Sequence, residues 1–342
     1  MSLNSTSPII VIGDNEVVYD SFTCSDQGNN TLVSLVVKSK DTDLNRSSLR
    51  GKQIKLFLNE GTSDNIPYFR GIINEVIPSD RGITIKAQDM RYLLTKKSAD
   101  NINITDDFNY DGYTLGQFLI EYIETNINVD DTLIGLDYIN DTKPTVSLSG
   151  FRANDISPYD VVKNNLTLDT SDLTNILKTS IAMRDDGKKS NIIFVREKNL
   201  DEGCVNFNEI DGISSISYIE RPSPNRISAK VLNRNVNYKH EKIANNFVVS
   251  DKLRKTFDFP DEAIQEAFVF AERSKDRYEV KLTVDKGHYL DIGNAVNIYL
   301  HDNETIRGKH RIVSKTLTGS PRGTMCSLSL NKANPILSEF LQ

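Results

Sequence analysis

The 342-residue chain has no tryptophan, only three cysteines and only four histidines. Cys24, Cys204 and Cys326 lie far apart and form no C-x-x-C pair, so neither a disulfide framework nor a cysteine metal site is indicated. No two histidines have the spacing of a zinc-binding H-x-x-H or H-E-x-x-H motif. No apolar run reaches 18 residues, and the start has no basic signal-peptide region. We therefore predict a chain that folds in a reducing cytoplasm without stable membrane association.

Motifs of the common enzyme classes are missing as well. The sequence contains no G-x-S-x-G elbow, no Walker A loop and no G-x-G-x-x-G fingerprint. A glycosidase would need a pair of carboxylates, which the many acidic residues could supply, but sugar clefts rely on aromatic platforms and tryptophan is absent. The segments "DTDLN" and "DDGKK" lack the spacing of a calcium loop and read as turns. We predict no enzymatic activity, no cofactor and no metal.

Charge is distributed unevenly along the chain. Residues 101–210 carry nine Lys/Arg against 19 Asp/Glu, whereas residues 211–342 carry 20 against 16. The acidic middle is not a nucleic-acid-binding surface, because phosphate affinity needs clustered Lys and Arg. Two interpretations remain open: a well-solvated domain, or a surface that repels DNA or attracts a basic partner.

Hydrophobic periodicity predicts an α+β fold made mainly of antiparallel strands. Residues 53–58 and 83–87 alternate with period two, as half-buried strands do. In the middle, Thr114 and Gln117 form a capping box that opens a helix, and Ser157 followed by Pro158 opens another. A hairpin turning at residues 185–187 follows, and the last third returns to strands around one further helix near 260–274.

One strand pattern occurs twice. "GKQIKLFL" begins at Gly51 and "GNAVNIYL" begins at Gly293, and each is followed by two strands that open with Arg-Gly. The first glycine of the strand and the glycines of the two Arg-Gly pairs recur at offsets of 242, 237 and 241 residues. We interpret this as two copies of one β-module; the alternative is that antiparallel meanders look alike. The expected first domain, residues 1–98, is the first module. Residues 99–210 are expected to form a mixed and acidic α/β insert. Residues 211–342 are expected to form the second module, which carries an inserted helix.

Several short motifs together resemble the baseplate hub protein family of contractile phage tails. They include Phe69-x-Gly71-x-Ile73, the segment from Asp89 to Leu93, Asn225-Arg-Ile before a strand, and the closing strands after Gly293. The sequence departs from the family pattern at Asn294, where an acidic residue is usual, and near Leu317, where a histidine is common. The structural positions that the resemblance assigns are Gly51, Phe69, Gly71, Asp89, Leu93, Asn225, Gly293, Gly308 and Gly323.

The resemblance implies two tail-tube-like β-barrel or sandwich modules that flank a mixed insert. It also implies a homotrimer whose six modules form a pseudo-six-fold ring, which adapts a hexameric tail tube to a trimeric spike. DNA would pass through the channel without specific binding, and acidic residues lining it would repel phosphate. Tape-measure and baseplate wedge proteins are further expected partners, and the expected location is the virion baseplate, assembled in the host cytoplasm.

Three other functions stay open at this point. The chain could serve in a phage-like contractile injection device or tailocin, which has the same architecture. It could also be a cell-wall-degrading tail enzyme, or a tail protein that binds a cell wall or receptor.

Overall fold

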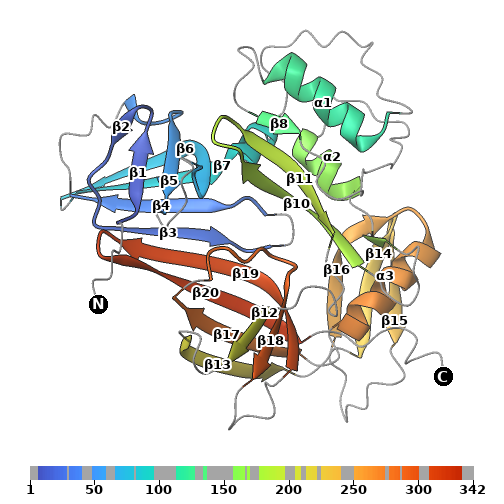
Figure 1. Ribbon diagram of the computed structural model, residues 1–342. Coiled ribbons are helices and arrows are strands. Elements are labelled where there is room, and N and C mark those ends of the chain that lie inside the picture. The colour runs from blue at the N-terminus through green and yellow to red at the C-terminus, as the bar shows by residue number, and fades with distance from the viewer. Residues whose placement is uncertain are drawn as a thin grey trace.

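A computed structural model describes most of the chain, namely residues 7–28, 31–40, 48–58, 66–80, 82–95, 113–127, 134–136, 157–165, 168–169, 177–196, 205–208, 213–221, 225–239, 250–273, 277–285, 287–299 and 308–332. These residues form one thirteen-stranded sheet, two small sheets and three α-helices (Figure 1). Nearly every strand pair of the large sheet is antiparallel, which confirms the predicted α+β, mainly antiparallel class. Within the described residues, no helix is long and apolar enough to cross a membrane.

The first part of the chain supplies seven strands of the large sheet and then a 3₁₀ helix, η2. The strands alternate between buried and partly exposed side chains, as the period-two pattern predicted. Their bounds are β1 Ile9–Ile12, β2 Asn15–Glu16, β3 Ser21–Asp26, β4 Ser34–Ser39, β5 Gln53–Phe57, β6 Phe69–Ser79 and β7 Gly82–Asp89, and η2 is Met90–Thr95.

The middle of the chain forms a four-stranded sheet beside two helices. The predicted capping box is present at the start of α1, where Thr114 Oγ1 accepts from Gln117 N and Gln117 Oε1 accepts from Thr114 N. Ser157 caps α2 in the same way by accepting from Asp160 N. The elements are α1 Leu115–Asn126, β8 Ile134–Leu136, α2 Pro158–Asn165, β9 Leu168–Asp169, β10 Leu177–Asp185 and β11 Ser190–Arg196.

The last part supplies six more strands of the large sheet and a small sheet covered by one helix. The predicted helix at 260–274 is α3, and it packs Ala263 and Ala267 against the small sheet. The large-sheet strands are β12 Val205–Asn208, β13 Ile213–Arg221, β17 Arg277–Val284, β18 Ala295–Tyr299, β19 Gly308–Ser320 and β20 Gly323–Lys332. The small sheet comprises β14 Arg226–Val231, β15 Arg234–Lys239 and β16 Ser250–Phe257, and α3 is Pro260–Arg273.

The large sheet contains the same strand order twice. Neighbouring strands run β3-β4-β7-β6-β5 in the first part and β13-β17-β20-β19-β18 in the last part. Where the first part joins β3 to β4 by a short loop, the last part inserts the small sheet and α3 between β13 and β17. We call these two five-strand sets the first and the second strand set.

The two strand sets also share a β-bulge. The register of β6 on β7 shifts just after Ile73, and that of β19 on β20 shifts just after Ile312. Both isoleucines exchange backbone hydrogen bonds with the glycine turn that precedes the neighbouring strand. The four bonds are Gly51 N to Ile73 O (2.8 Å), Ile73 N to Lys52 O (3.0 Å), Gly293 N to Ile312 O (2.9 Å) and Ile312 N to Asn294 O (3.0 Å).

Strand pairing corrects the sequence alignment of the repeat at one landmark. Ile54, three residues after Gly51, pairs with Gly71, whereas Val296, three residues after Gly293, pairs with His310. Gly71 is therefore equivalent to His310, and the predicted match between Gly71 and Gly308 is wrong by two residues. A slip of two keeps every side chain on the same face, so the alternation of the sequence could not reveal it.

One apolar core runs through both strand sets. It includes Phe22, Leu35 and Ile85 from the first set and Leu317 and Leu328 from the second, all buried. A second core lies between η2, α1, α2 and the β10–β11 hairpin, and a third lies under α3. The two strand sets are thus one continuous body rather than two separate β-domains.

Candidate functional site

The two strand sets meet where β3 pairs with β19, and we call this contact the junction. β18 covers only the first part of β19, up to Arg311, and β3 pairs with the remaining part. The paired residues are Lys315 with Asp26, Thr316 with Ser25, Leu317 with Cys24, Thr318 with Thr23 and Gly319 with Phe22. In Figure 1, β3 and β19 lie side by side in the middle of the sheet. The junction therefore joins the two copies by main-chain pairing.

A glycine lets the junction close tightly on its core side. Phe22, Cys24 and Leu317 are buried there, with 2%, 4% and 0% of their surface exposed. A Cβ added to Gly319 would lie 2.4 Å from the Phe22 ring, so the ring occupies the space that only glycine leaves free. Packing against the core thus adds to the hydrogen bonds of the ladder.

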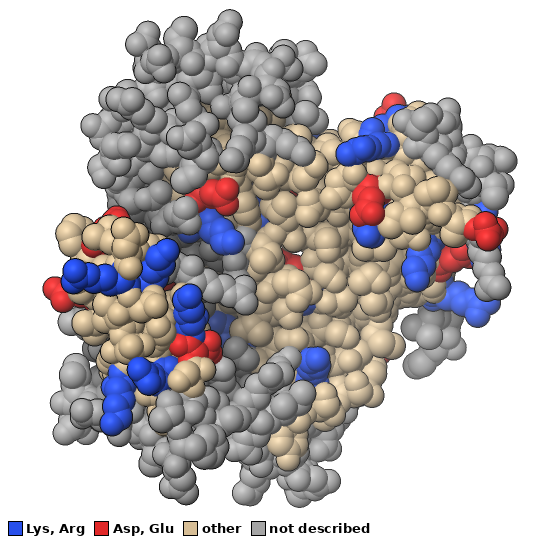
Figure 2. Space-filling model, turned by 180° about the vertical axis from the view of Figure 1, so that it is seen from behind, with Lys and Arg blue, Asp and Glu red and all other residues tan. Residues whose placement is uncertain are grey.

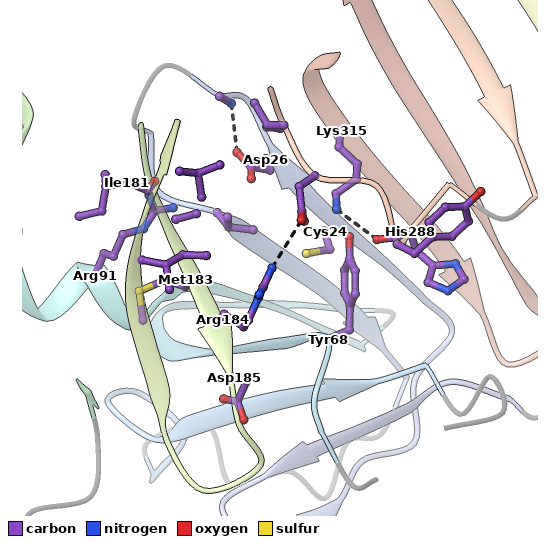
Figure 3. Close-up of a pocket in the computed structure, with 18 of the residues that line it drawn as sticks. Cys24, Asp26, Tyr68, Arg91, Ile181, Met183, Arg184, Asp185, His288 and Lys315 are labelled. Carbon is purple, nitrogen blue, oxygen red and sulfur yellow. Dashed lines mark hydrogen bonds and ion pairs between the residues drawn. The ribbon is translucent and has the colours of Figure 1, made fainter. Parts of the chain in front are cut away.

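A cavity of about 360 Å³ lies beside the junction, between β3, β19 and the β10–β11 hairpin. Figure 3 shows the Lys315 side chain reaching toward Cys24 and Tyr68 in this cavity. The Lys315 ammonium donates to Leu290 O at 2.7 Å and to His288 O at 3.2 Å, and lies 5.3 Å from the centre of the Tyr68 ring. These contacts compensate the burial of the lysine charge.

Two thiols, that of Cys24 in the lining of this cavity and that of the neighbouring Cys326, are poorly suited to nucleophilic catalysis. Burial raises the pKa of the Cys24 thiol to about 12 and that of Cys326 to about 11, although the Lys315 charge acts in the opposite direction. A thiol with such a pKa is protonated at neutral pH and is a weak nucleophile. Burial also raises the pKa of Asp26 and of Tyr68. Among the described residues, no group of three His, Cys, Asp or Glu side chains is placed to hold a metal ion.

These pKa values predict that Cys24 and Cys326 resist thiol reagents at pH 8 in the folded protein and react once urea unfolds it. The measurement is colorimetric thiol counting in a Cys204→Ser background. A Ser250→Cys variant is the matched positive control, because Ser250 is exposed at the start of β16. Rapid modification of either native cysteine without urea would contradict the buried, protonated state.

Arg91 and Asp89 form the most deeply buried ion pair among the described residues. The Arg91 guanidinium donates to the Asp89 carboxylate at 2.6–3.1 Å, to Ile181 O at 2.7 Å and to Thr31 O at 2.9 Å. The Asp89 carboxylate also accepts from Val33 N at 2.7 Å. The Arg91 and Asp89 side chains are 2% and 3% exposed. The pair thus fastens two segments to the end of β7: the loop that precedes β4, and strand β10.

Arg70 fastens the turn of the same hairpin. It forms a two-pronged ion pair with the Asp185 carboxylate, with Nη2 2.9 Å from Oδ1. It also donates to Lys188 O at 3.0 Å and to Gly187 O at 3.1 Å. Both partners of the ion pair are at most 5% exposed. Arg70 and Arg91 together attach the β10–β11 hairpin to the first strand set.

The outer face of the small sheet is positively charged. Arg226, Lys230, Lys239 and Lys252 are exposed on β14, β15 and β16, on the side away from α3. In Figure 2, which shows the molecule from behind, Lys and Arg gather on the left, where these strands lie. A face of this kind favours an acidic partner, in contrast to the acidic middle of the sequence.

The structure places the predicted structural positions mainly at strand starts, turns and the first core. Gly51 and Gly293 adopt φ angles of 85° and 86° in the matched turns, a region that favours glycine. Gly71 has no such angle; an added Cβ would lie 2.2 Å from Gln88 O, so close approach of β7 explains this glycine. The others lie as follows: Phe69 buried at the start of β6, Asp89 buried at the end of β7, Leu93 in η2, Asn225 before β14, Gly308 at the start of β19 and Gly323 at the start of β20.

No sequence motif pointed to Arg70, Arg91 or Lys315. Arg91 follows the motif residue Asp89 by two positions, and this spacing is the one signal that could have indicated a local ion pair. Arg70 and its partner Asp185 are 115 residues apart in sequence, and no pattern connects them. These three cations matter because each holds together segments that are distant in sequence.

No protein-family model matches the chain, and no curated protein sequence matches it. Solved structures do resemble it in shape. A 43 kDa tail protein of prophage MuSo2 from Shewanella oneidensis matches with a TM-score of 0.66 and 12% identity, over 96% of this chain and 97% of that one. A tail protein from Neisseria meningitidis MC58 matches with a TM-score of 0.62 and 11% identity, over 95% and 96%.

An Escherichia coli component of the type VI secretion system also matches, with a TM-score of 0.56 and 10% identity, over 95% of this chain and 77% of that one. That protein is described as structurally similar to tail proteins of bacteriophage T4. At such low identities the likeness concerns the fold. The chain therefore has the fold of phage tail proteins, as its resemblance to baseplate hub proteins implied.

Proposed function

We propose that the chain is a baseplate hub protein, a structural and non-enzymatic component at the distal end of a phage tail tube. Three copies form a ring around a channel for DNA, and the ring adapts the hexameric tube to a trimeric spike. The partners are the tail tube protein and the spike, with the tape-measure and baseplate wedge proteins as further contacts. The ring assembles in the host cytoplasm and ends in the virion baseplate.

One observation carries this proposal: the same five-strand order occurs twice in one sheet. Two equivalent units in each chain give six units in a trimer, and six units match a hexameric tube while three chains match a trimeric spike. The proposed domains are 1–98, 99–210 and 211–342. Strand β12 lies before residue 211 but pairs with β18, so we assign it to the second module.

A second candidate is the hub of a contractile injection device or tailocin. The type VI secretion component among the similar structures favours it, because that protein is itself described as structurally similar to bacteriophage T4 tail proteins. The architecture is the same in both cases, and the cargo differs. Capsid and terminase genes beside the gene for this chain would indicate a phage.

The proposal predicts a complex of three chains. Native mass spectrometry should give three times the 38.5 kDa chain mass, for the chain alone or with its spike protein, and electron-microscopy class averages should show six similar lobes around an open channel. The alternative of a cell-wall-degrading enzyme is tested by adding the protein to a peptidoglycan suspension. The proposal predicts that the turbidity of the suspension does not fall. A monomer both with and without the spike would overturn the proposal.

A further inference from the structure

Besides its ends at β2 and β12, the large sheet has two open edges, one in each strand set. β13 is the last strand at one end, and its outer side has no partner among the described strands. β6 pairs with β5 only through Phe69–Ile72, so the second half of β6, from Glu75 to Ser79, has no described strand on that side. Each edge exposes an apolar side chain, with Tyr218 of β13 46% and Ile77 of β6 39% accessible. Open edges of this kind are templates for further strand pairing.

These two edges are equivalent to the two edges that form the junction. The strand orders match β3 to β13 and β19 to β6. Each chain therefore uses one pair of edges internally, β3 with the second half of β19, and leaves the equivalent pair, β13 with the second half of β6, unused. The used pair is buried: Cys24 of β3 is 4% exposed, whereas its equivalent Tyr218 is 46% exposed.

The equivalence can be derived residue by residue from the bulges. Ile73 pairs with Ala87 and Ile312 with Leu330, so counting six residues onward from each bulge isoleucine makes Ser79 equivalent to Thr318. On the other strands, Ala87 pairs with Leu35 and Leu330 with Val280. Leu35 in turn pairs with Cys24 and Val280 with Tyr218, which makes Thr23 equivalent to Ser217.

We propose that the second half of β6 in one copy pairs antiparallel with β13 of a second copy, in the register of the junction. Since Thr318 faces Thr23 within the chain, Ser79 then faces Ser217 of the second copy. This inference rests on the proposed function, because two modules per chain and three chains close such a contact into a ring. The contact is head-to-tail, and closure of the ring leaves neither β13 nor the second half of β6 unpaired in any copy.

The contact between copies is weaker than the junction it copies. Pro78 occupies the position equivalent to Leu317, and proline has no N–H to donate to a partner strand. Proline on an edge discourages unspecific pairing, and the partner must then offer the right register and an apolar surface. Tyr218 and the partly buried Ile216 supply that surface on β13. A second copy of this chain is the partner whose edge fits, because its β3–β19 pairing already shows the geometry.

Disulfide trapping tests the register directly. The variant Ser79→Cys/Ser217→Cys is made in a Cys204→Ser background; both serines are exposed, and the native Cys24 and Cys326 are buried. Residues directly opposite in an antiparallel pair have Cα atoms roughly 4.5–5.5 Å apart, within disulfide range. The matched control, Ile77→Cys/Ser217→Cys, shifts one cysteine by two residues on the same face. Each single variant serves as a further control.

After mild oxidation, the two variants are compared on a denaturing gel. We expect Ser79→Cys/Ser217→Cys to give covalently linked dimers and trimers, and we expect the control to stay monomeric. Efficient linking of the control instead would overturn the register. A trimer by light scattering without any link in the test variant would overturn this contact and leave the proposed function standing. A monomer by light scattering, with and without the spike, would remove the proposed function itself.

Discussion

Replacing Arg91 with alanine should lower the free energy of unfolding by about 3–5 kcal/mol, because it leaves the buried Asp89 charge without its partner. The variant also loses the hydrogen bonds to Ile181 O and Thr31 O, which connect β10 and the loop before β4 to the end of β7. Urea unfolding followed by circular dichroism measures the difference. We expect one of the largest losses of any single substitution in the chain, since the pair is almost fully buried.

The matched control for this prediction is Arg50→Ala, because Arg50 is exposed and its loss should change stability by less than about 0.5 kcal/mol. A double variant, Asp89→Asn/Arg91→Met, separates the ion pair from the remaining contacts. It removes both charges, so it should be less damaging than Arg91→Ala alone. Equal losses in the double and the single variant would show that the unpaired carboxylate is not the cause.

Replacing Gly71 with alanine should cost about 2–3 kcal/mol or more through overpacking. The added Cβ would lie 2.2 Å from Gln88 O and 2.6 Å from the Phe69 ring, so β6 and β7 would have to separate. Thermal unfolding should show a lower midpoint, and hydrogen exchange should show faster exchange in β6 and β7. Shortening Phe69 in a Gly71→Ala/Phe69→Leu variant should not rescue the protein, because the nearest obstacle is backbone.

Gly13→Ala is the matched control for Gly71→Ala. Gly13 has a φ of 60° and open space where a Cβ would be added, so alanine there costs only the strain of its backbone angle, about 1–2 kcal/mol. The expected order of stability is wild type, then Gly13→Ala, then Gly71→Ala. The reverse order would mean that the sheet yields easily at Gly71 and that close approach does not explain this glycine.

Local signals predicted the elements well. The capping box at Thr114, Pro158 and Pro260 at helix starts and the hairpin turn at Gly187 each act within four residues, and the structure has all of them. The fold class followed from the alternation of the strands. Strand β15 was not predicted, because its side chains are mostly exposed and it presents no strongly apolar face.

The junction and its surroundings could not be predicted in the same way. The strand that pairs with β3 is determined by which strand edges the rest of the fold leaves unpaired, and no local sequence pattern marks such an edge. The parallel pairing of β12 with β18 likewise joins segments that are 91 residues apart. The partners of Arg70 and Lys315 are carbonyl groups or distant side chains, which any sequence can supply. The repeat was recognisable, but its register depended on a bulge that alternation does not reveal.

The junction also affects how the chain folds. Ser25 and Thr316, which face each other across it, are 291 residues apart in sequence. At about 5–20 residues per second of synthesis, β3 waits roughly 15–60 s for the strand that completes its edge. Contacts of such long range form late and slowly, after the local hairpins. During that interval each nascent chain offers β3 to any strand nearby, including β19 of another copy, so the same duplication that builds the sheet makes strand exchange between chains its main folding hazard.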